Sequence, residues 1–302
     1  LLSRRQRQMC IRDREYTAVL MQGSGTFGVE SVLTSVIGRE DKLLIAANGA
    51  YGLRMAEICR HAGIAYTLYE QDNHKRPQAD VVAKYLAEDL AITHVSMVHG
   101  ETTSGILNDV EAVGRVVKAA GKTFLVDAMS TFGGVDIPVA GWGIDFLVSS
   151  ANKCIQGVPG FSFILANREK LEASAGQARS LALDLYDQWK TMNEDGKWRF
   201  TSPTHVVLAF APALDAMQKM DDLQHRLAAD PHNAALTEEI AHCTAIVDAM
   251  DSTTGEMDIL NKLPRWVGKA AVRFIMWLDK HGWVPDSMTC NDPYYSLSLI
   301  HI

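Results

Sequence analysis

The sequence predicts an α/β fold in which a mostly parallel sheet is sandwiched by helices. Short β-branched and aromatic runs alternate with helical stretches from Glu15 to about Met220, which is typical of βα units. The 302 residues and 47% apolar content suffice for one large domain with a packed core and a smaller second part. Several predicted strands are followed by glycine-rich polar turns, where ligands of such sheets bind.

The predicted elements follow from apolar periodicity and from the residues at their ends. Gly23-Ser24-Gly25 opens the first helix, and Gly121 ends the fourth. Strands are expected at Thr17–Met21, Lys42–Ala46, Ala65–Tyr69, His94–Val98, Thr123–Val126, Phe146–Val148 and Phe161–Leu165. Helices are expected at Thr26–Ile37, after the turn Asn48-Gly49-Ala50-Tyr51-Gly52 as far as His61, at Ala79–Leu90 and at Val110–Ala120.

The chain is expected to have three parts. Residues 1–14 are basic, lack the apolar core of a signal peptide and look non-native, with a disordered basic arm as the alternative. The terminal Ser296–Ile302 looks equally non-native. Residues 15–220 form the predicted large domain. Residues 221–302, with expected helices at Glu238–Met250 and Val267–Lys280, form a segment of unknown origin that may be foreign to the rest.

Composition excludes several classes of protein. The net charge of −7 is spread along the chain, which gives no sign of nucleic-acid binding. No apolar run approaches the length of a membrane span. Five scattered cysteines without a Cys-x-x-Cys pair fit a reducing cytoplasm better than a disulfide framework. Ten histidines without ligand spacing indicate no metal site.

The loop from Gly23 to Gly28 matches the pattern G-x-G-x-x-G between a strand and a helix. A nicotinamide site would require an acid at the end of the next strand, but that strand ends at Asn48. Backbone N–H groups at a helix start, with the hydroxyls of Ser24 and Thr26, suit a phosphate monoester. A phosphate-binding turn is therefore the better interpretation, with a ligand-free glycine turn as the alternative.

Asp127 and Lys153 follow two strands that are one crossover apart in the sequence. Both are expected at the edge of the sheet where the phosphate turn lies. A carboxylate against a pyridine nitrogen and a lysine that can form a Schiff base are the groups that pyridoxal 5′-phosphate chemistry needs. Taken singly, Asp127 could be a helix N-cap and Lys153 a surface lysine.

Two further turns bring candidate contacts to the same edge. Tyr51 lies between glycines after a strand, where its ring can stack on a planar cofactor or pack within the loop. Thr102 lies in the run from His99 to Gly105, also after a strand, and either contacts a cofactor or caps a turn.

These motifs closely resemble those of the 2-aminoethylphosphonate:pyruvate aminotransferases, a branch of the class V aminotransferases within fold-type I. The resemblance runs from about residue 15 to 220. It is carried by the stretches 22–26, 48–52, 99–105, 126–130, 149–161 and 197–205.

The resemblance implies a role for each candidate residue. Lys153 would be the Schiff-base lysine and Asp127 the partner of the pyridine nitrogen. The phosphate would be held by Ser24, Gly25 and Thr26, the ring by Tyr51 and Thr102, and Thr201 would reach the phosphate of a neighbouring subunit's cofactor. A cytoplasmic homodimer with shared active sites is therefore expected.

The expected activity is the transfer of the amino group of 2-aminoethylphosphonate to pyruvate, which yields phosphonoacetaldehyde and L-alanine. Family members begin earlier and end in a small domain with a substrate-binding arginine in a Phe-Arg-Ile-Gly motif. That motif does not occur after Asp221. The alternatives are a catalytically silent fragment that keeps a cofactor-binding core, or an alanine:glyoxylate or serine:pyruvate aminotransferase of the same class.

Overall fold

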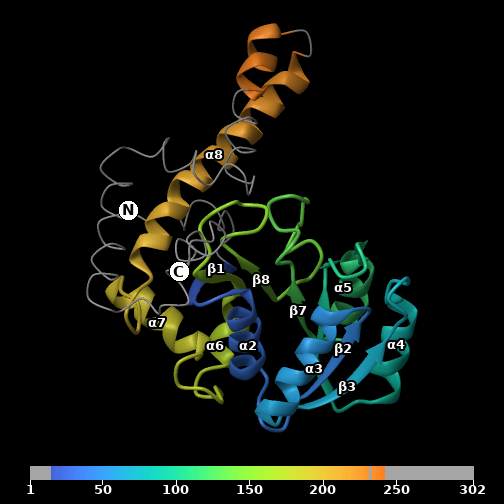
Figure 1. The fold of residues 1–302 in the computed structure, drawn as a ribbon. Coiled ribbons are helices and arrows are strands. Elements are labelled where there is room, and N and C mark those ends of the chain that lie inside the picture. Colours follow the sequence, from blue (N-terminus) through green and yellow to red (C-terminus); the bar gives the residue numbers. More distant parts are fainter. Residues whose placement is uncertain (1–14, 231–232, 242–302) are drawn as a thin grey trace, which may run out of the picture. The chain divides into compact units, whose positions relative to one another are not determined.

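The computed structural model describes residues 15–230 and 233–241 (Figure 1). Contacts divide the chain into two units, Leu1–Leu208 and Ala209–Ile302. The first unit contains the sheet and the candidate site. Helix α8 (Thr204–Ala229) begins in the first unit and continues into the second.

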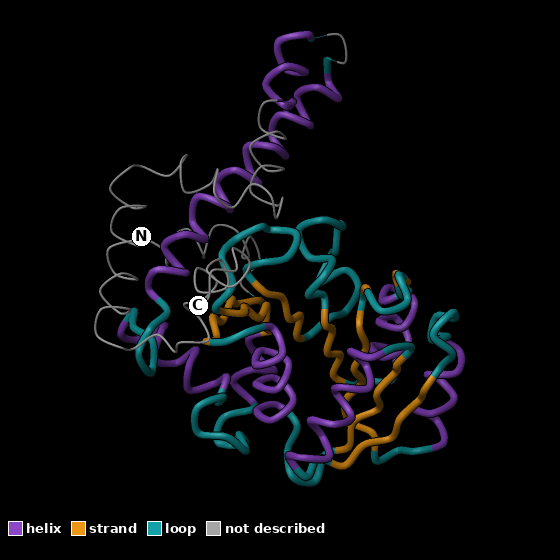
Figure 2. Tube along the Cα trace, viewed as in Figure 1, coloured by secondary structure: helices purple, strands orange, loops and turns teal. Residues whose placement is uncertain are grey.

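A seven-stranded sheet forms the centre of the first unit, with the strand order β1-β9-β8-β7-β4-β2-β3 (Figure 2). Only β9 runs against its neighbours among these strands, because both β1 and β8 pair with it in antiparallel fashion. The other pairs are parallel. The strands are β1 (Tyr16–Gln22), β2 (Lys42–Ala47), β3 (Ala65–Glu70), β4 (Ile92–Val98), β7 (Thr123–Asp127), β8 (Phe146–Ser150) and β9 (Phe161–Asn167).

Helices cover both faces of this sheet, so the inner strands are buried on both sides. Alternate residues of one strand enter different cores: Leu43 and Ile45 of β2 face one cluster, and Leu44 and Ala46 the other. The first cluster packs against α2 (Gly25–Val36), α3 (Ala50–Ala62), α6 (Arg168–Ala173) and α7 (Leu185–Asp195). The second packs against α4 (Ala79–Glu88) and α5 (Val110–Ala119).

The predicted α/β fold with a mostly parallel sheet is confirmed. The seven predicted strands and four predicted helices are present, with ends that differ by at most three residues. The sequence pattern did not predict α6, α7, α8 or the short hairpin of β5 (Gly100–Glu101) and β6 (Ile106–Leu107).

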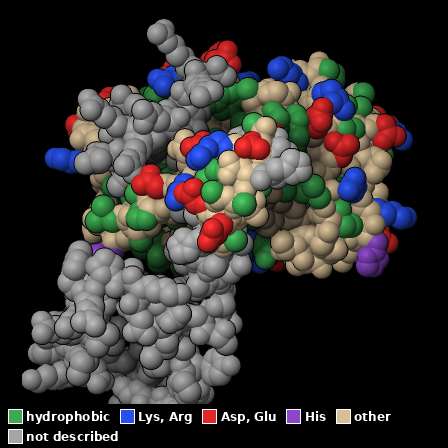
Figure 3. All heavy atoms as spheres, turned by 90° about the horizontal axis from the view of Figure 1, so that it is seen from above, with side chains coloured by type: hydrophobic (Ala, Val, Ile, Leu, Met, Phe, Trp, Pro, Cys, Tyr) green, Lys and Arg blue, Asp and Glu red, His purple; other side chains and the backbone are tan. Residues whose placement is uncertain are grey.

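The predicted boundary at residue 220 falls inside α8 and stays a prediction. Segment 1–14, the expected helix Val267–Lys280 and most of the expected helix Glu238–Met250 lie outside the described residues. Within the described part, no helix is both long and apolar enough to cross a membrane. On the face drawn in Figure 3, positive and negative side chains are interspersed over the described surface.

Candidate active site

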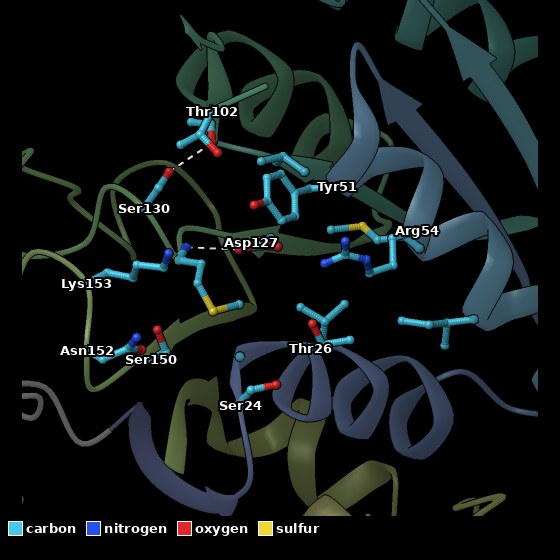
Figure 4. A pocket seen from close by; sticks show the side chains of 17 residues that line it. Ser24, Thr26, Tyr51, Arg54, Thr102, Asp127, Ser130, Ser150, Asn152 and Lys153 are labelled. Atoms are coloured by element: carbon cyan, nitrogen blue, oxygen red, sulfur yellow. Dashed lines mark hydrogen bonds between the residues drawn. The ribbon is translucent and has the colours of Figure 1, made fainter. Parts of the chain in front are cut away.

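A cavity of about 270 Å³ lies at the carboxyl-terminal edge of the sheet. Its walls come from the segments that follow β1, β2, β4, β7 and β8. In parallel sheets these segments converge on one edge, because each strand delivers its following loop to the same side. Seven residues expected from the sequence line this cavity (Figure 4): Ser24, Gly25, Thr26, Tyr51, Thr102, Asp127 and Lys153.

Helix α2 begins at the cavity with its backbone N–H groups available. The N-cap residue, Ser24, makes no side-chain capping bond, and the first turn contains no acidic residue. In an α-helix the first N–H groups, here those of Gly25 and Thr26, have no acceptor within the helix. Together with the positive end of the helix dipole, they favour a bound anion at this position.

Two glycines allow the close approach of α2 to its surroundings. A Cβ atom on Gly25 would lie 1.5 Å from Sδ of Met129, which also lines the cavity. A Cβ atom on Gly28 would lie 2.5 Å from Oγ of Ser162 on β9. Gly25 therefore keeps the α2 end of the cavity open, and Gly28 lets the helix lie against the sheet.

Asp127 is the last residue of β7, and only 6% of its surface is exposed. Its Oδ1 accepts a hydrogen bond from the backbone N–H of Met129 at 2.9 Å. Burial raises the pKa of Asp127 to about 6, an effect opposed by that hydrogen bond, increased by the charge of Glu101 and reduced by Arg54. Asp127 is thus an unusually basic carboxylate at the base of the cavity, suited to a protonated nitrogen.

Lys153 lies in the turn that follows β8 and is exposed toward the cavity. The turn is closed by backbone hydrogen bonds from Gln156 N–H to the Lys153 carbonyl at 2.7 Å and from Gly157 N–H to the Ala151 carbonyl at 2.8 Å. Lys153 forms no ion pair with any described residue. Its amine is therefore free to react or to carry a proton.

Tyr51 and Arg54 enter the cavity from the first turn of α3. The guanidinium of Arg54 lies 5.0 Å from the centroid of the Tyr51 ring. In Figure 4, Arg54 and Lys153 point into the cavity from opposite sides, with Asp127 between them in this view. The Tyr51 ring forms a flat wall of the site, which suits an aromatic ligand.

Ten residues that line the cavity have no role predicted from the sequence, and five of them are Arg54, Met129, Ser130, Ser150 and Asn152. Arg54 is three residues after Tyr51 on a helix, so helical spacing carried a signal for it. Ser150 and Asn152 flank the run that leads to Lys153. The buried Ser150 hydroxyl has no hydrogen-bond partner among the described residues, as expected of a group that faces a ligand.

Thr201 does not line this cavity. It is exposed, in an irregular segment between α7 and α8. Its expected contact with a neighbouring subunit's cofactor stays a prediction.

Among residues 15–230 and 233–241, no group of three or more His, Cys, Asp or Glu side chains is arranged to hold a metal ion. Of the cysteines in these ranges, Cys59 is buried and Cys154 is exposed, and both are free thiols.

Curated relatives match this chain over much of its length. A 2-aminoethylphosphonate–pyruvate transaminase of Lysinibacillus sphaericus is 56% identical over 207 residues, which cover 68% of this chain and 57% of the relative. Proteins of the same name from Salmonella gallinarum and Klebsiella pneumoniae are 52% and 56% identical, covering 70% and 66% of this chain and 58% and 54% of the relatives. The chain thus spans little more than half the length of these relatives.

Solved structures of aminotransferases share the fold. Pyridoxamine–pyruvate aminotransferase from Mesorhizobium loti superposes with a TM-score of 0.65 at 24% identity, covering 72% of this chain and 56% of that one. Alanine–glyoxylate aminotransferase from Nostoc sp. gives a TM-score of 0.64 at 21% identity, covering 76% and 64%. A model of the family described as aminotransferase class-V matches residues 4–254. The resemblance seen in the sequence motifs is therefore confirmed, and the chain belongs to the class-V aminotransferase family.

Proposed function

We propose that this chain binds pyridoxal 5′-phosphate in the cavity and provides the cofactor domain of a 2-aminoethylphosphonate:pyruvate transaminase. The observation that carries the cofactor assignment is that Asp127, Lys153 and the uncapped start of α2 line one cavity. The substrate assignment is supported by the relatives of that name at 52–56% identity.

The cavity fits the cofactor in three respects. The start of α2 offers backbone N–H groups and hydroxyls to a phosphate and carries no competing acidic residue in its first turn. The basic carboxylate of Asp127 suits a protonated pyridine nitrogen. The buried Ser150 hydroxyl, which no described residue hydrogen-bonds, is a polar group that a ligand can satisfy.

Each residue then has a defined task. Ser24, Gly25 and Thr26 would hold the phosphate, and Asp127 would keep the ring nitrogen protonated. Tyr51 would stack on the ring, and Thr102 would contact its edge. When bound, the cofactor would supply a ring that accepts the electrons released when the C–H bond beside the substrate amine breaks. The Lys153 amine would be the base that moves the proton released from that carbon.

The assembled enzyme is proposed to be a cytoplasmic homodimer. Thr201 is exposed and lies away from the cavity of its own chain, which leaves it free to contact the phosphate site of a second subunit. The free thiols of Cys59 and Cys154 fit a reducing compartment.

The test uses the full chain, loaded with pyridoxal 5′-phosphate and supplied with 2-aminoethylphosphonate and pyruvate. Formation of L-alanine and phosphonoacetaldehyde in equal amounts is expected. Parallel reactions replace the substrates by alanine with glyoxylate and by serine with pyruvate. Turnover of either of these pairs in place of 2-aminoethylphosphonate contradicts the substrate assignment. Cofactor binding without any turnover supports the alternative of a silent fragment.

A further inference from the structure

Glu101 is a buried carboxylate close to the cavity that the proposed chemistry does not use. It is the second residue of β5, and only 1% of its surface is exposed. It forms no ion pair with any described residue. A carboxylate in such a place is costly unless hydrogen bonds satisfy its oxygens, so its partners indicate its purpose.

The Glu101 carboxylate is held by Thr103 of its own loop and by the start of α3. Oε2 accepts a hydrogen bond from the backbone N–H of Tyr51 at 3.2 Å. Oε1 accepts from the hydroxyl of Thr103 at 2.5 Å and from its backbone N–H at 3.3 Å. The Thr103 hydroxyl in turn accepts from the backbone N–H of Ala50 at 3.3 Å. Both carboxylate oxygens are therefore satisfied, and one of them directly holds Tyr51.

Helix α3 has no cap of its own. Its N-cap residue is Gly49, which has no side chain, and its first turn contains no acidic residue. A Cβ atom on Gly49 would lie 2.4 Å from Cγ of Glu101, so the glycine makes room for the carboxylate. Glu101 thus supplies, from a distant loop, the negative group that a helix start normally takes from its own N-cap.

This arrangement determines where two walls of the cavity lie. Tyr51 and Arg54 both belong to the first turns of α3, and both line the cavity. Movement of the helix start relative to the 100–103 loop would shift the Tyr51 ring relative to Asp127. The charge of Glu101 also contributes to the raised pKa of Asp127, after the larger effect of burial.

We propose that Glu101 is a positioning residue: its carboxylate caps α3 from outside the helix and thereby fixes the Tyr51 ring against the ligand in the cavity. This inference rests on the proposed cofactor, and Glu101 itself touches neither the cofactor nor the substrate.

The experiment measures the dissociation constant of pyridoxal 5′-phosphate by its visible absorption, in the absence of substrate, for the full-length chain. Glu101→Ala is expected to weaken binding by about tenfold. Glu101→Gln keeps an acceptor for the Tyr51 N–H but not the charge, so it should recover part of that loss. The matched control is Glu111→Gln on α5, an exposed glutamate paired with Arg115, which should bind as the wild type does.

A double-mutant cycle with Tyr51→Ala separates positioning from general stability. If Glu101 acts through the Tyr51 ring, Glu101→Ala should weaken binding much less in a Tyr51→Ala background. Additive effects, or unchanged binding in both Glu101 variants, would overturn the inference while leaving the proposed function intact. Absence of cofactor binding by the wild type would overturn both. Melting temperatures identify variants that fail to fold. If Glu101→Ala fails to fold, Glu101→Gln takes its place in the double-mutant cycle.

Discussion

The buried carboxylate of Asp127 lowers the stability of the fold but favours the binding of a protonated nitrogen. Its carboxylate is 6% exposed, and burial raises its pKa from the ordinary 3.8 to about 6. A shift of this size corresponds to about 3 kcal/mol of unfavourable free energy for the ionised form at neutral pH. The same basicity makes the carboxylate a strong partner for a protonated ring nitrogen.

The pH dependence of stability follows from this shift. Because the folded-state pKa is raised, the contribution of Asp127 to stability is fully present below about pH 4 and is lost as the pH rises through about 6. Asp127→Asn has no charge to bury and keeps an oxygen for the Met129 N–H. In urea unfolding of the cofactor-free protein, its advantage over the wild type should grow by about 1 kcal/mol between pH 5 and pH 7.

The same substitution should weaken cofactor binding, since a neutral amide is a poorer partner for the ring nitrogen than a carboxylate. An advantage of Asp127→Asn that stays constant or shrinks with rising pH would contradict the buried, basic state of Asp127.

At the scale of single elements, the start of α2 carries the proposed phosphate site. Its N–H groups face the cavity without a capping side chain, and Gly25 leaves room beside Met129. Such a helix start gains little stability from its own residues, which is consistent with a site reserved for an anion.

Gly25→Ala tests this role. The added methyl group would overlap Met129 and push that flexible side chain within the cavity, so cofactor affinity should fall by about tenfold or more, while folding changes little. Isothermal titration with pyridoxal 5′-phosphate measures the loss. Gly141→Ala is the control, because Gly141 does not line the cavity and its Cβ would meet only Pro138, at 3.3 Å. Equal affinities for the two variants would show that the α2 start is not the phosphate site.

The elements were predictable where local chemistry is strong. The short apolar runs of β2, β4 and β7 have few alternatives to a buried strand, and glycine turns marked the starts of α2 and α3. The reversed direction of β9 was not predictable. The direction of a strand depends on its pairing, here with β1 and β8, and the residues Phe161–Leu165 alone do not encode it. Helix α6 was missed because six residues are too few for a periodic pattern.

In the candidate site, too, some features follow from the local sequence and others only from the folded chain. Asp127, Lys153 and the phosphate turn each follow a strand, so the topology of a parallel sheet predicts their convergence. Glu101 also stood in a recognisable motif, but its bond to Tyr51 joins β5 to the start of α3, 50 residues apart along the chain, and only the folded chain reveals it.

At the scale of the whole molecule, the site exists because one sheet collects loops from across some 130 residues of chain. Ser24 follows β1 and Lys153 follows β8, yet β9 lies between these strands in the sheet. Because β9 lies antiparallel between β1 and β8, it sets the distance between the start of α2 and Lys153. None of the individual segments forms a site alone, which makes the convergence a property of the fold.

The most direct measurement is to incubate the full chain with pyridoxal 5′-phosphate, reduce it with borohydride and locate the modified lysine by peptide mass spectrometry. The structure predicts modification at Lys153, with Lys153→Ala as the control that loses it. Modification spread over surface lysines, or concentrated at a lysine outside the cavity, would contradict the claim that Lys153 and Asp127 face one cofactor.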